Sequence, residues 1–370
     1  MRVVKLGDVA RESRLKWTKS KQDVPIVGLE HLIPDEIRFD AYDINTDNTF
    51  SKRFVKGQVL FGRRRAYQRK AAIAEFDGIC SGDITVIEAI EGKMVSELLP
   101  FIIQTPVFFD YANRGSAGSL SPRVKWEHLL DYEFELPSLE EQKVLADKLW
   151  AAYRLKEAYK KLLVATDEMV KSQFIEMFGD CKSQGTLSSL CATFIDGDWI
   201  ESKDQSDNGI RLIQTGNVGF GFFKGREDKS RYITEETFKK LNCTEVMPGD
   251  ILISRLPDPI GRACIVPEGI GKAITAVDCT IVRLNATLLP EFLISFSKTA
   301  LYASQINKIK TGTTRLRVSR GNLGNVIIPI PPIESQHRFA AIAQQADKSK
   351  FELKQCIENI DKVIKSLING

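Results

Sequence analysis

The residues best suited to chemistry in this chain form a basic loop. Residues 63–70 read Arg-Arg-Arg-Ala-Tyr-Gln-Arg-Lys and follow the apolar run at 57–61. Such a loop can neutralise phosphates and still offer guanidinium or amide groups to base edges. A solvated surface is the alternative interpretation of any basic run. The pattern predicts DNA contact, with these candidate residues: Arg63, Arg64, Arg65, Tyr67, Gln68, Arg69 and Lys70.

A second candidate lies in the glycine turn at 118–123. This segment reads Gly-Ser-Leu-Ser-Pro-Arg and offers the candidate residues Ser119, Ser121 and Arg123. Hydroxyls, glycine amides and arginine suit phosphate contacts that fix the register of a protein on DNA. A plain structural turn remains the alternative interpretation.

Both features belong to an internal repeat. Placing Gly118 on Gly312, an offset of 194 residues, aligns the rest of the chain without a gap. The aligned pairs include Arg123 with Arg317, Glu140 with Glu334, Gln142 with Gln336, Lys156 with Lys350, and Asp167 with Asp361. This period is far longer than that of solenoid repeats, so it predicts two copies of a whole domain related by a pseudo-twofold axis.

The second copy carries different loops on the same frame. Its counterpart of the basic loop, residues 255–262, reads Arg-Leu-Pro-Asp-Pro-Ile-Gly-Arg and is stiffened by two prolines. Its counterpart of the glycine turn is the segment 312–317. Different loops at matched positions would suit two unrelated half-sites. The candidates here are Arg255, Arg262, Thr313, Thr314, Arg315 and Arg317.

The secondary structure predicted from the sequence is α+β, with two β-rich domains separated by long helices. Residues 138–178 and 333–369 contain neither glycine nor proline, which predicts two long helices. Short β-rich runs precede each helix and predict a curved antiparallel sheet in each copy. We therefore expect domains at residues 1–137 and 181–332 and helices at 138–180 and 333–370.

The apolar positions of these helices step by three and four, which indicates a coiled-coil seam and an antiparallel helix pair. The alternative is that each helix lies separately on its own domain. The predicted seam comprises Leu145, Ala152, Leu155, Tyr159, Leu162, Thr166 and Met169 in the first helix, and Phe339, Ala346, Leu353, Cys356, Ile360, Val363 and Leu367 in the second.

Composition favours a soluble protein. The chain has 370 residues, 43% apolar and 27% charged, and a net charge of +4, which permits nucleic-acid binding without indicating it. No apolar run could cross a membrane, and the first residues, MRVVKLGDVARESR, are too polar for a signal peptide, so we expect a cytoplasmic protein. Seven scattered cysteines and three isolated histidines favour neither disulfides nor a metal site.

The duplicated layout resembles a known family. A β-rich segment, a Gly-Ser or Gly-Thr turn (118–119 and 312–313), a strand leading to Pro-x-x-Glu-x-Gln (137–142 and 331–336) and a long helix all occur twice. This arrangement resembles the specificity subunit of type I restriction-modification systems over essentially the whole chain. The second copy departs from the first at Ser335, where the first has Glu141.

The resemblance implies a DNA-reading subunit with no catalytic site of its own. Each β-rich segment would be a target recognition domain that reads half of a bipartite sequence in double-stranded DNA. The helices would separate the two halves and dock two modification subunits, which bind S-adenosylmethionine and methylate adenine. Restriction subunits would add translocation and cleavage driven by ATP with Mg²⁺, so no cofactor is expected on this chain.

Two other functions remain alternatives. A duplicated scaffold could bind only protein through its helices, and it would show no salt-dependent affinity for duplex DNA. A nuclease could use Asp83 with Glu91 and Lys93, although the second copy offers only Asp278 and no matching acid and lysine.

Overall fold

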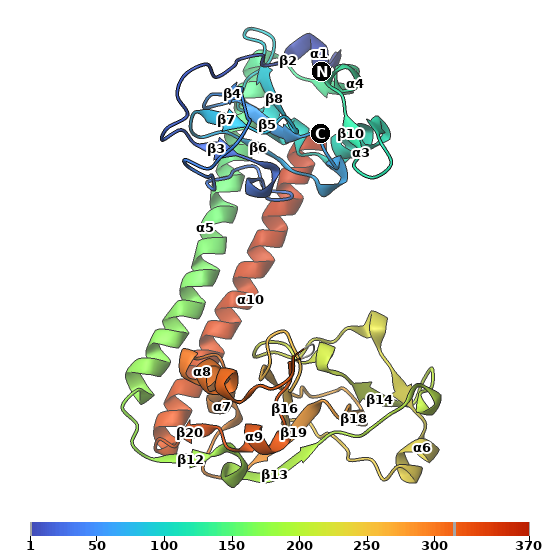
Figure 1. The fold of residues 1–370 in the computed structure, drawn as a ribbon, viewed down its shortest axis with the longest axis vertical. Coiled ribbons are helices and arrows are strands. Elements are labelled where there is room, and N and C mark those ends of the chain that lie inside the picture. The colour runs from blue at the N-terminus through green and yellow to red at the C-terminus, as the bar shows by residue number, and fades with distance from the viewer. Residues whose placement is uncertain (1, 314–315, 370) are drawn as a thin grey trace. The chain divides into compact units, whose positions relative to one another are not determined.

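The computed structural model describes residues 2–313 and 316–369, which fall into two compact units (Figure 1). Unit 1 comprises Met1–Tyr159 with Gln355–Gly370, and unit 2 comprises Lys160–Lys354. The long helices α5 (Leu139–Phe178) and α10 (Ile333–Asn369) cross this division. Each helix therefore contributes one end to each unit.

Unit 1 is built on two small sheets. A four-stranded antiparallel sheet has the order β2-β8-β5-β6, and a three-stranded sheet has the order β3-β7-β4 with β3 and β7 parallel. The strands of these sheets are β2 (Ala10–Glu12), β3 (Ile26–Val27), β4 (Lys52–Phe54), β5 (Val59–Gly62), β6 (Ala71–Ile73), β7 (Gly78–Cys80) and β8 (Ile84–Ala89). Two further pairs are β1 (Arg2–Lys5) with β11 (Glu133–Leu136) and β9 (Ser116–Ala117) with β10 (Arg123–Val124). The short helices are α1 (Leu6–Val9), α2 (Leu99–Ile103), α3 (Pro106–Arg114) and α4 (Trp126–Leu129).

Unit 2 repeats this plan. Its four-stranded antiparallel sheet has the order β13-β19-β16-β17, and its three-stranded sheet has the order β15-β14-β18 with β14 and β18 parallel. The strands are β12 (Gln184–Thr186), β13 (Cys191–Asp196), β14 (Ile210–Ile213), β15 (Tyr232–Ile233), β16 (Ile251–Ser254), β17 (Ala263–Ile265), β18 (Ala273–Thr275), β19 (Cys279–Leu284) and β20 (Ile327–Pro329), which pairs with β12. The short helices are α6 (Glu235–Lys240), α7 (Pro290–Ser297), α8 (Ala300–Ile309) and α9 (Arg320–Gly324).

The predicted α+β class with two β-rich domains and long helices is confirmed. The prediction of a single antiparallel sheet per domain was incomplete, because each unit also has a small mixed sheet. Strands as short as β3 carry no alternation of apolar and polar residues from which a sequence pattern could identify them.

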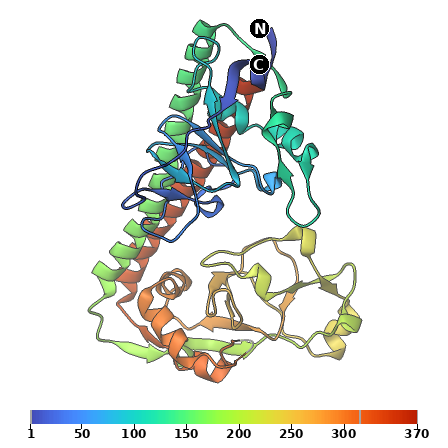
Figure 2. The ribbon, with the colours of Figure 1, turned by 45° about the horizontal axis from the view of Figure 1, so that its top comes forward.

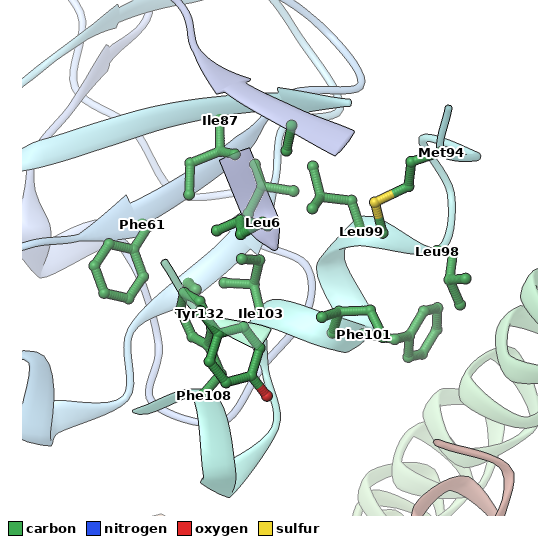
Figure 3. Packing of buried hydrophobic residues seen from close by; sticks show 14 of the residues in the cluster. Leu6, Phe61, Ile87, Met94, Leu98, Leu99, Phe101, Ile103, Phe108 and Tyr132 are labelled. Carbon is green, nitrogen blue, oxygen red and sulfur yellow. The ribbon is translucent and has the colours of Figure 1, made fainter. Parts of the chain in front are cut away.

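The long helices complete the core of each unit. In unit 1 the four-stranded sheet and the short helices enclose a cluster that includes Leu6 of α1, Phe61 of β5, Ile87 of β8 and Ile103 of α2 (Figure 3). Leu149 and Tyr153 of α5 belong to the same cluster. In unit 2 the rings of Phe174 on α5, Phe292 on α7 and Phe339 on α10 pack together.

Within each unit α5 and α10 lie side by side and run antiparallel (Figure 2). In unit 1, Lys156 Nζ lies 2.7 Å from Asp361 Oδ1, and Leu145 lines a cavity with Leu367. In unit 2, Lys350 Nζ lies 2.8 Å from Asp167 Oδ1. The two ion pairs are equivalent under the repeat, because Lys156 aligns with Lys350 and Asp361 aligns with Asp167.

The predicted seam is only partly correct. Leu155, Leu162, Met169 and Val363 are exposed, at 46%, 50%, 50% and 52%. In their place α5 buries Leu149, Trp150, Tyr153 and Phe174. The large rings at the ends of α5 pack against the domain cores, and this contact determines the buried face more than the partner helix does.

The glutamine of each Pro-x-x-Glu-x-Gln motif is structural. Gln142 accepts a hydrogen bond from Val95 N (2.9 Å) and donates to Pro137 O (3.0 Å). Gln336 accepts from Leu289 N (2.8 Å) and donates to Thr287 O and Pro331 O. Both side chains are buried, at 1% and 0% exposure. The motif therefore ties the start of each long helix to the loop that leads into α2 or α7.

Replacing Phe339 with alanine should destabilise unit 2 by about 3–5 kcal/mol, because a fully buried ring is removed from an aromatic cluster. Phe351→Ala on the same helix is the matched control, since Phe351 is 64% exposed and should change stability by less than about 0.5 kcal/mol. Urea unfolding measures both variants. Equal midpoints for the two would show that the helix does not complete the core of unit 2.

Candidate nucleic-acid interface

The basic loop of unit 1 follows β5 and folds over a buried alanine. Gly62 N donates to Lys70 O across the loop (2.8 Å), and a 3-10 turn at Ala66–Gln68 places Ala66 in the core. Arg65 and Arg69 flank that turn in the left-handed conformation, each with φ 54°. This backbone leaves Arg65 exposed and Tyr67 57% exposed.

Asp83 joins the two segments that the sequence identified separately. Its Oδ1 lies 2.7 Å from Arg123 Nε, and its Oδ2 lies 3.3 Å from Arg64 Nη1. Arg64 also donates to Ser121 Oγ. The carboxylate therefore binds the basic loop and the glycine turn together as one surface.

The glycine turn is the tip of the β9–β10 hairpin. Arg123 pairs with Ala117 in its register, and the basic loop is attached to it through Arg65 N, which donates to Pro122 O (2.8 Å). The hairpin extends away from the sheets of its unit (Figure 2). At its tip Ser119 and Leu120 are exposed, Leu120 at 91%. The surface thus combines hydroxyls, an apolar tip and arginines.

Two arginines hold the Asp83 carboxylate ionised. Partial burial acts to raise the pKa of Asp83, but hydrogen bonds and charge from Arg123 and Arg64 outweigh burial and lower the pKa from its usual value of 3.8. A carboxylate with both oxygens engaged by arginines is poorly placed to bind a metal ion. Its repeat counterpart Asp278 forms no ion pair with an arginine within the described residues. The arrangement gives no support to the nuclease alternative.

An Asp83→Asn variant should lose a few tenths of a molar in its urea midpoint at pH 7, because these partly exposed ion pairs are screened by solvent. A lowered folded-state pKa contributes stability above the unfolded value of about 3.9 and loses it as pH falls through the folded value. The difference from the unaltered chain should therefore shrink below about pH 4. The exposed control Asp110→Asn should match the unaltered chain throughout. A difference that stays constant down to acid pH would contradict the ion-pair assignment.

The remaining predicted residues of unit 1 support the loop. Arg69 pairs with Asp35 (2.6 Å) and lies over the ring of Phe109. Lys70 Nζ donates to Leu29 O (2.7 Å), and Arg63 and Gln68 are half-buried. The groups most open to a ligand are Arg65, Tyr67, Ser119 and Arg123.

In unit 2 the structure corrects the assignment of Arg255. Its backbone occupies the place of Arg63, since Arg255 N donates to Asp278 O as Arg63 N does to Asp83 O, each at 2.9 Å. The side chain, however, is buried at 6% exposure. It donates to Val318 O and Val277 O and lies 3.3 Å from Asp196 Oδ1. Arg255 therefore organises the loop and does not face a ligand.

The predicted role of Arg262 as a DNA contact is corrected for the same reason. It is 6% exposed and donates to the backbone oxygens of Thr215, Val218, Leu256 and Pro259 at 2.7–3.0 Å. Burial lowers the pKa of Arg262 from its usual value. The sequence pattern could not separate a guanidinium that binds carbonyls inside its own loop from one that faces DNA.

The glycine turn of unit 2 is described in part. Thr311 and Arg317 exchange backbone hydrogen bonds of 2.8 Å, and Thr313 and Arg317 are exposed. Thr314 and Arg315 lie outside the described residues. Thr313 and Arg317 remain candidates for phosphate contact.

Sequence reasoning missed a basic hollow in unit 2. Arg226, Lys229 and Arg231 line a hollow of about 400 Å³ together with Gln214, Asn217 and Ser230. Its cations come from the segment 224–231, Lys-Gly-Arg-Glu-Asp-Lys-Ser-Arg. The interleaved Glu227 and Asp228 obscure that signal, and the segment lies away from the repeat positions compared.

Other features of the chain add little to the site. Donor atoms of Glu30, His31 and Asp43 lie within 4.8 Å of one another, so His31 is less isolated than the sequence suggested. His31 Nδ1 already accepts a hydrogen bond from Gly28 N (2.9 Å). No helix in the described ranges is both long and apolar enough to cross a membrane.

Two β-rich domains share two long helices, and comparison with known proteins identifies the family that has this arrangement. The sequence model described as type I restriction modification DNA specificity domain matches residues 1–163 and again residues 185–362. The chain belongs to this family and carries its domain twice, as the internal repeat predicted.

Two characterised relatives belong to the same family, but the matches to them cover less of the chain. The specificity subunit of type I restriction enzyme EcoDI from Escherichia coli is 30% identical over 150 residues, which cover 38% of this chain and 32% of the relative. The EcoBI specificity subunit from the same organism is 21% identical over 299 residues, which cover 71% of this chain and 62% of the relative. The chain thus matches less than two thirds of the length of either relative.

Solved structures share the fold. A chain solved in work on complex assembly and conformational transition of the type I R-M system has a TM-score of 0.61 at 18% identity, covering 100% of this chain and 96% of its own. The type I restriction-modification S subunit from M. genitalium has a TM-score of 0.60 at 11% identity, covering 99% and 94%.

Proposed function

We propose that this chain is the sequence-reading subunit of a type I restriction-modification complex and carries no reaction itself. Each β-rich domain reads one half of a bipartite target in double-stranded DNA. The observation that carries the proposal is that the two domains share one fold but have loops of different chemistry at the same position. Arg63 and Arg255 share their backbone contacts, yet the loop of unit 1 exposes cations and that of unit 2 buries its arginines.

In unit 1 the proposed contacts divide by chemistry. Ser119 and Arg123 at the hairpin offer donors to phosphates, which fix register. Arg65 and Tyr67 on the adjoining loop offer a guanidinium and an aromatic ring to the bases. Asp83 keeps both segments in one orientation, so their contacts are made together.

The long helices are the proposed docking surface for two modification subunits. α5 and α10 leave apolar side chains exposed along their length, among them Leu155, Leu162, Met169, Phe351 and Val363. Because the repeat gives each unit an equivalent helix end, two copies of one partner would find equivalent surfaces. Restriction subunits would join this assembly, with S-adenosylmethionine, ATP and Mg²⁺ on the partner subunits. The complex would act in the cytoplasm.

A titration of the full chain with mixed-sequence duplex DNA at increasing KCl separates this function from a protein-only scaffold. We expect the chain to bind duplex DNA. The logarithm of its association constant should fall linearly with the logarithm of salt concentration, with a slope of about −0.9 for each phosphate neutralised. Affinity for duplex that is absent, or insensitive to salt, would favour the scaffold.

A further inference from the structure

Unit 2 has a basic hollow whose charges are not neutralised by ion pairs among the described residues. Arg226, Lys229 and Arg231 are exposed, and none of the three forms an ion pair within the part of the chain that the structure describes. The residues that line the hollow include no carboxylate. Three cations in a hollow that no carboxylate lines favour an anionic ligand.

The neighbouring acids are turned to other partners. Glu227 Oε1 lies 3.0 Å from Arg211 Nη2, and its other oxygen accepts from Ser230 Oγ. Asp228 lies on the same 3-10 turn, Glu227–Lys229, but does not line the hollow. Neither acid therefore lines the hollow, although both alternate with its cations in the sequence.

The backbone around the hollow is held in place by buried contacts. Asn217, 8% exposed, donates to Lys224 O and Gly225 O, each at 2.9 Å, and accepts from Gln214 N at 3.0 Å. Arg226 adopts the left-handed conformation, with φ 52°. Its guanidinium occupies the space where a side chain at Gly216 would lie, so a larger residue there would displace it. The shape of the hollow is thus held by the side chains and backbone of unit 2.

We propose that this hollow binds the phosphates of the DNA backbone and anchors unit 2 on the half-site that it reads. The inference rests on the proposed function and adds the contact that the burial of Arg255 and Arg262 leaves missing in unit 2. An open, polar hollow with separate cations suits phosphate oxygens, which carry charge without sequence information. It should therefore supply affinity and register, while base discrimination comes from other residues.

The test compares two double variants of the full chain with equal loss of charge. Arg226→Gln with Lys229→Gln removes two cations of the hollow. Lys239→Gln with Lys240→Gln removes two exposed cations from α6 of the same unit. Mixed-sequence duplex is titrated at several KCl concentrations, and melting temperatures confirm that both variants are folded. The hollow variant should bind roughly 10- to 100-fold more weakly, with a salt slope smaller by about two, and the α6 control should match the unaltered chain.

A second readout separates anchoring from base reading. In cells with the modification subunit, the hollow variant should leave the methylated motif unchanged while lowering the fraction of sites modified. A changed preference at one half of the motif would overturn the phosphate assignment, and so would equal losses in the hollow and α6 variants. If the unaltered chain does not bind duplex at any salt concentration, the proposed function fails as well. If it binds and the hollow variant binds equally, only this inference fails.

Discussion

Replacing Arg63, Arg64 and Arg65 with alanine is expected to remove recognition of one half of the DNA target and to leave the preference for the other half unchanged. The triple change deletes the exposed guanidinium of Arg65 and releases Ser121 and Asp83 from Arg64, so the loop and the hairpin lose their common orientation. Discrimination worth about 1–3 kcal/mol for each base contact should be lost at that half-site alone. Methylation mapping in cells measures both halves at once.

A matched control removes the same charge elsewhere in unit 1. Lys16, Lys19 and Lys56 are exposed, and their replacement by alanine should preserve both half-site preferences. If the arginine variant degrades both halves equally, the loop is only a shared electrostatic anchor. If it degrades neither half, the assignment of the basic loop is wrong.

Inserting seven residues after Tyr159 and seven after Leu353 is expected to lengthen the unread spacer between the half-sites by about three base pairs. Seven helical residues add about 10 Å, and DNA rises about 3.4 Å per base pair. Each insertion leaves intact the ion pair of Lys156 with Asp361 in unit 1 and that of Lys350 with Asp167 in unit 2. A heptad also preserves the spacing of three and four along the helices.

The same insertion placed in the loop after α5, at residues 179–183, is the control and should leave the spacer unchanged. Three added base pairs also rotate one half-site by roughly a third of a turn, so methylation should fall in extent even where the new spacing is recognised. Methylation at the original spacing and at full level would show that the helices do not determine the spacer.

Much of the architecture could be predicted because it depends on local signals and on the repeat. The absence of glycine and proline predicted α5 and α10, and the aligned residues Lys156, Lys350, Asp167 and Asp361 form one ion pair in each unit. The buried face of α5 could not be read in the same way. Helical spacing identifies a stripe, but the rings of Trp150 and Phe174 pack on domain cores that lie far away in the sequence.

The candidate site shows the same limit more strongly. Sequence spacing located the basic loop and the glycine turn, but their union through Asp83 is a contact across 40 residues. Burial reversed the assignment of Arg255, because an arginine beside prolines looks the same in sequence whether it binds carbonyls or faces solvent. The hollow at Arg226 depends on a left-handed residue and on a glycine ten positions earlier, and no periodic pattern records that combination.

We propose, above all, that two copies of one domain, with different loops at matched positions, read the two halves of one DNA target. It can be tested by mapping methylated adenines across the genome of a host that expresses this chain together with a type I modification subunit. We expect a single bipartite motif, with a modified adenine in each half and a spacer of fixed length in which any base is accepted. A continuous motif, or no methylation that depends on this chain, would contradict it.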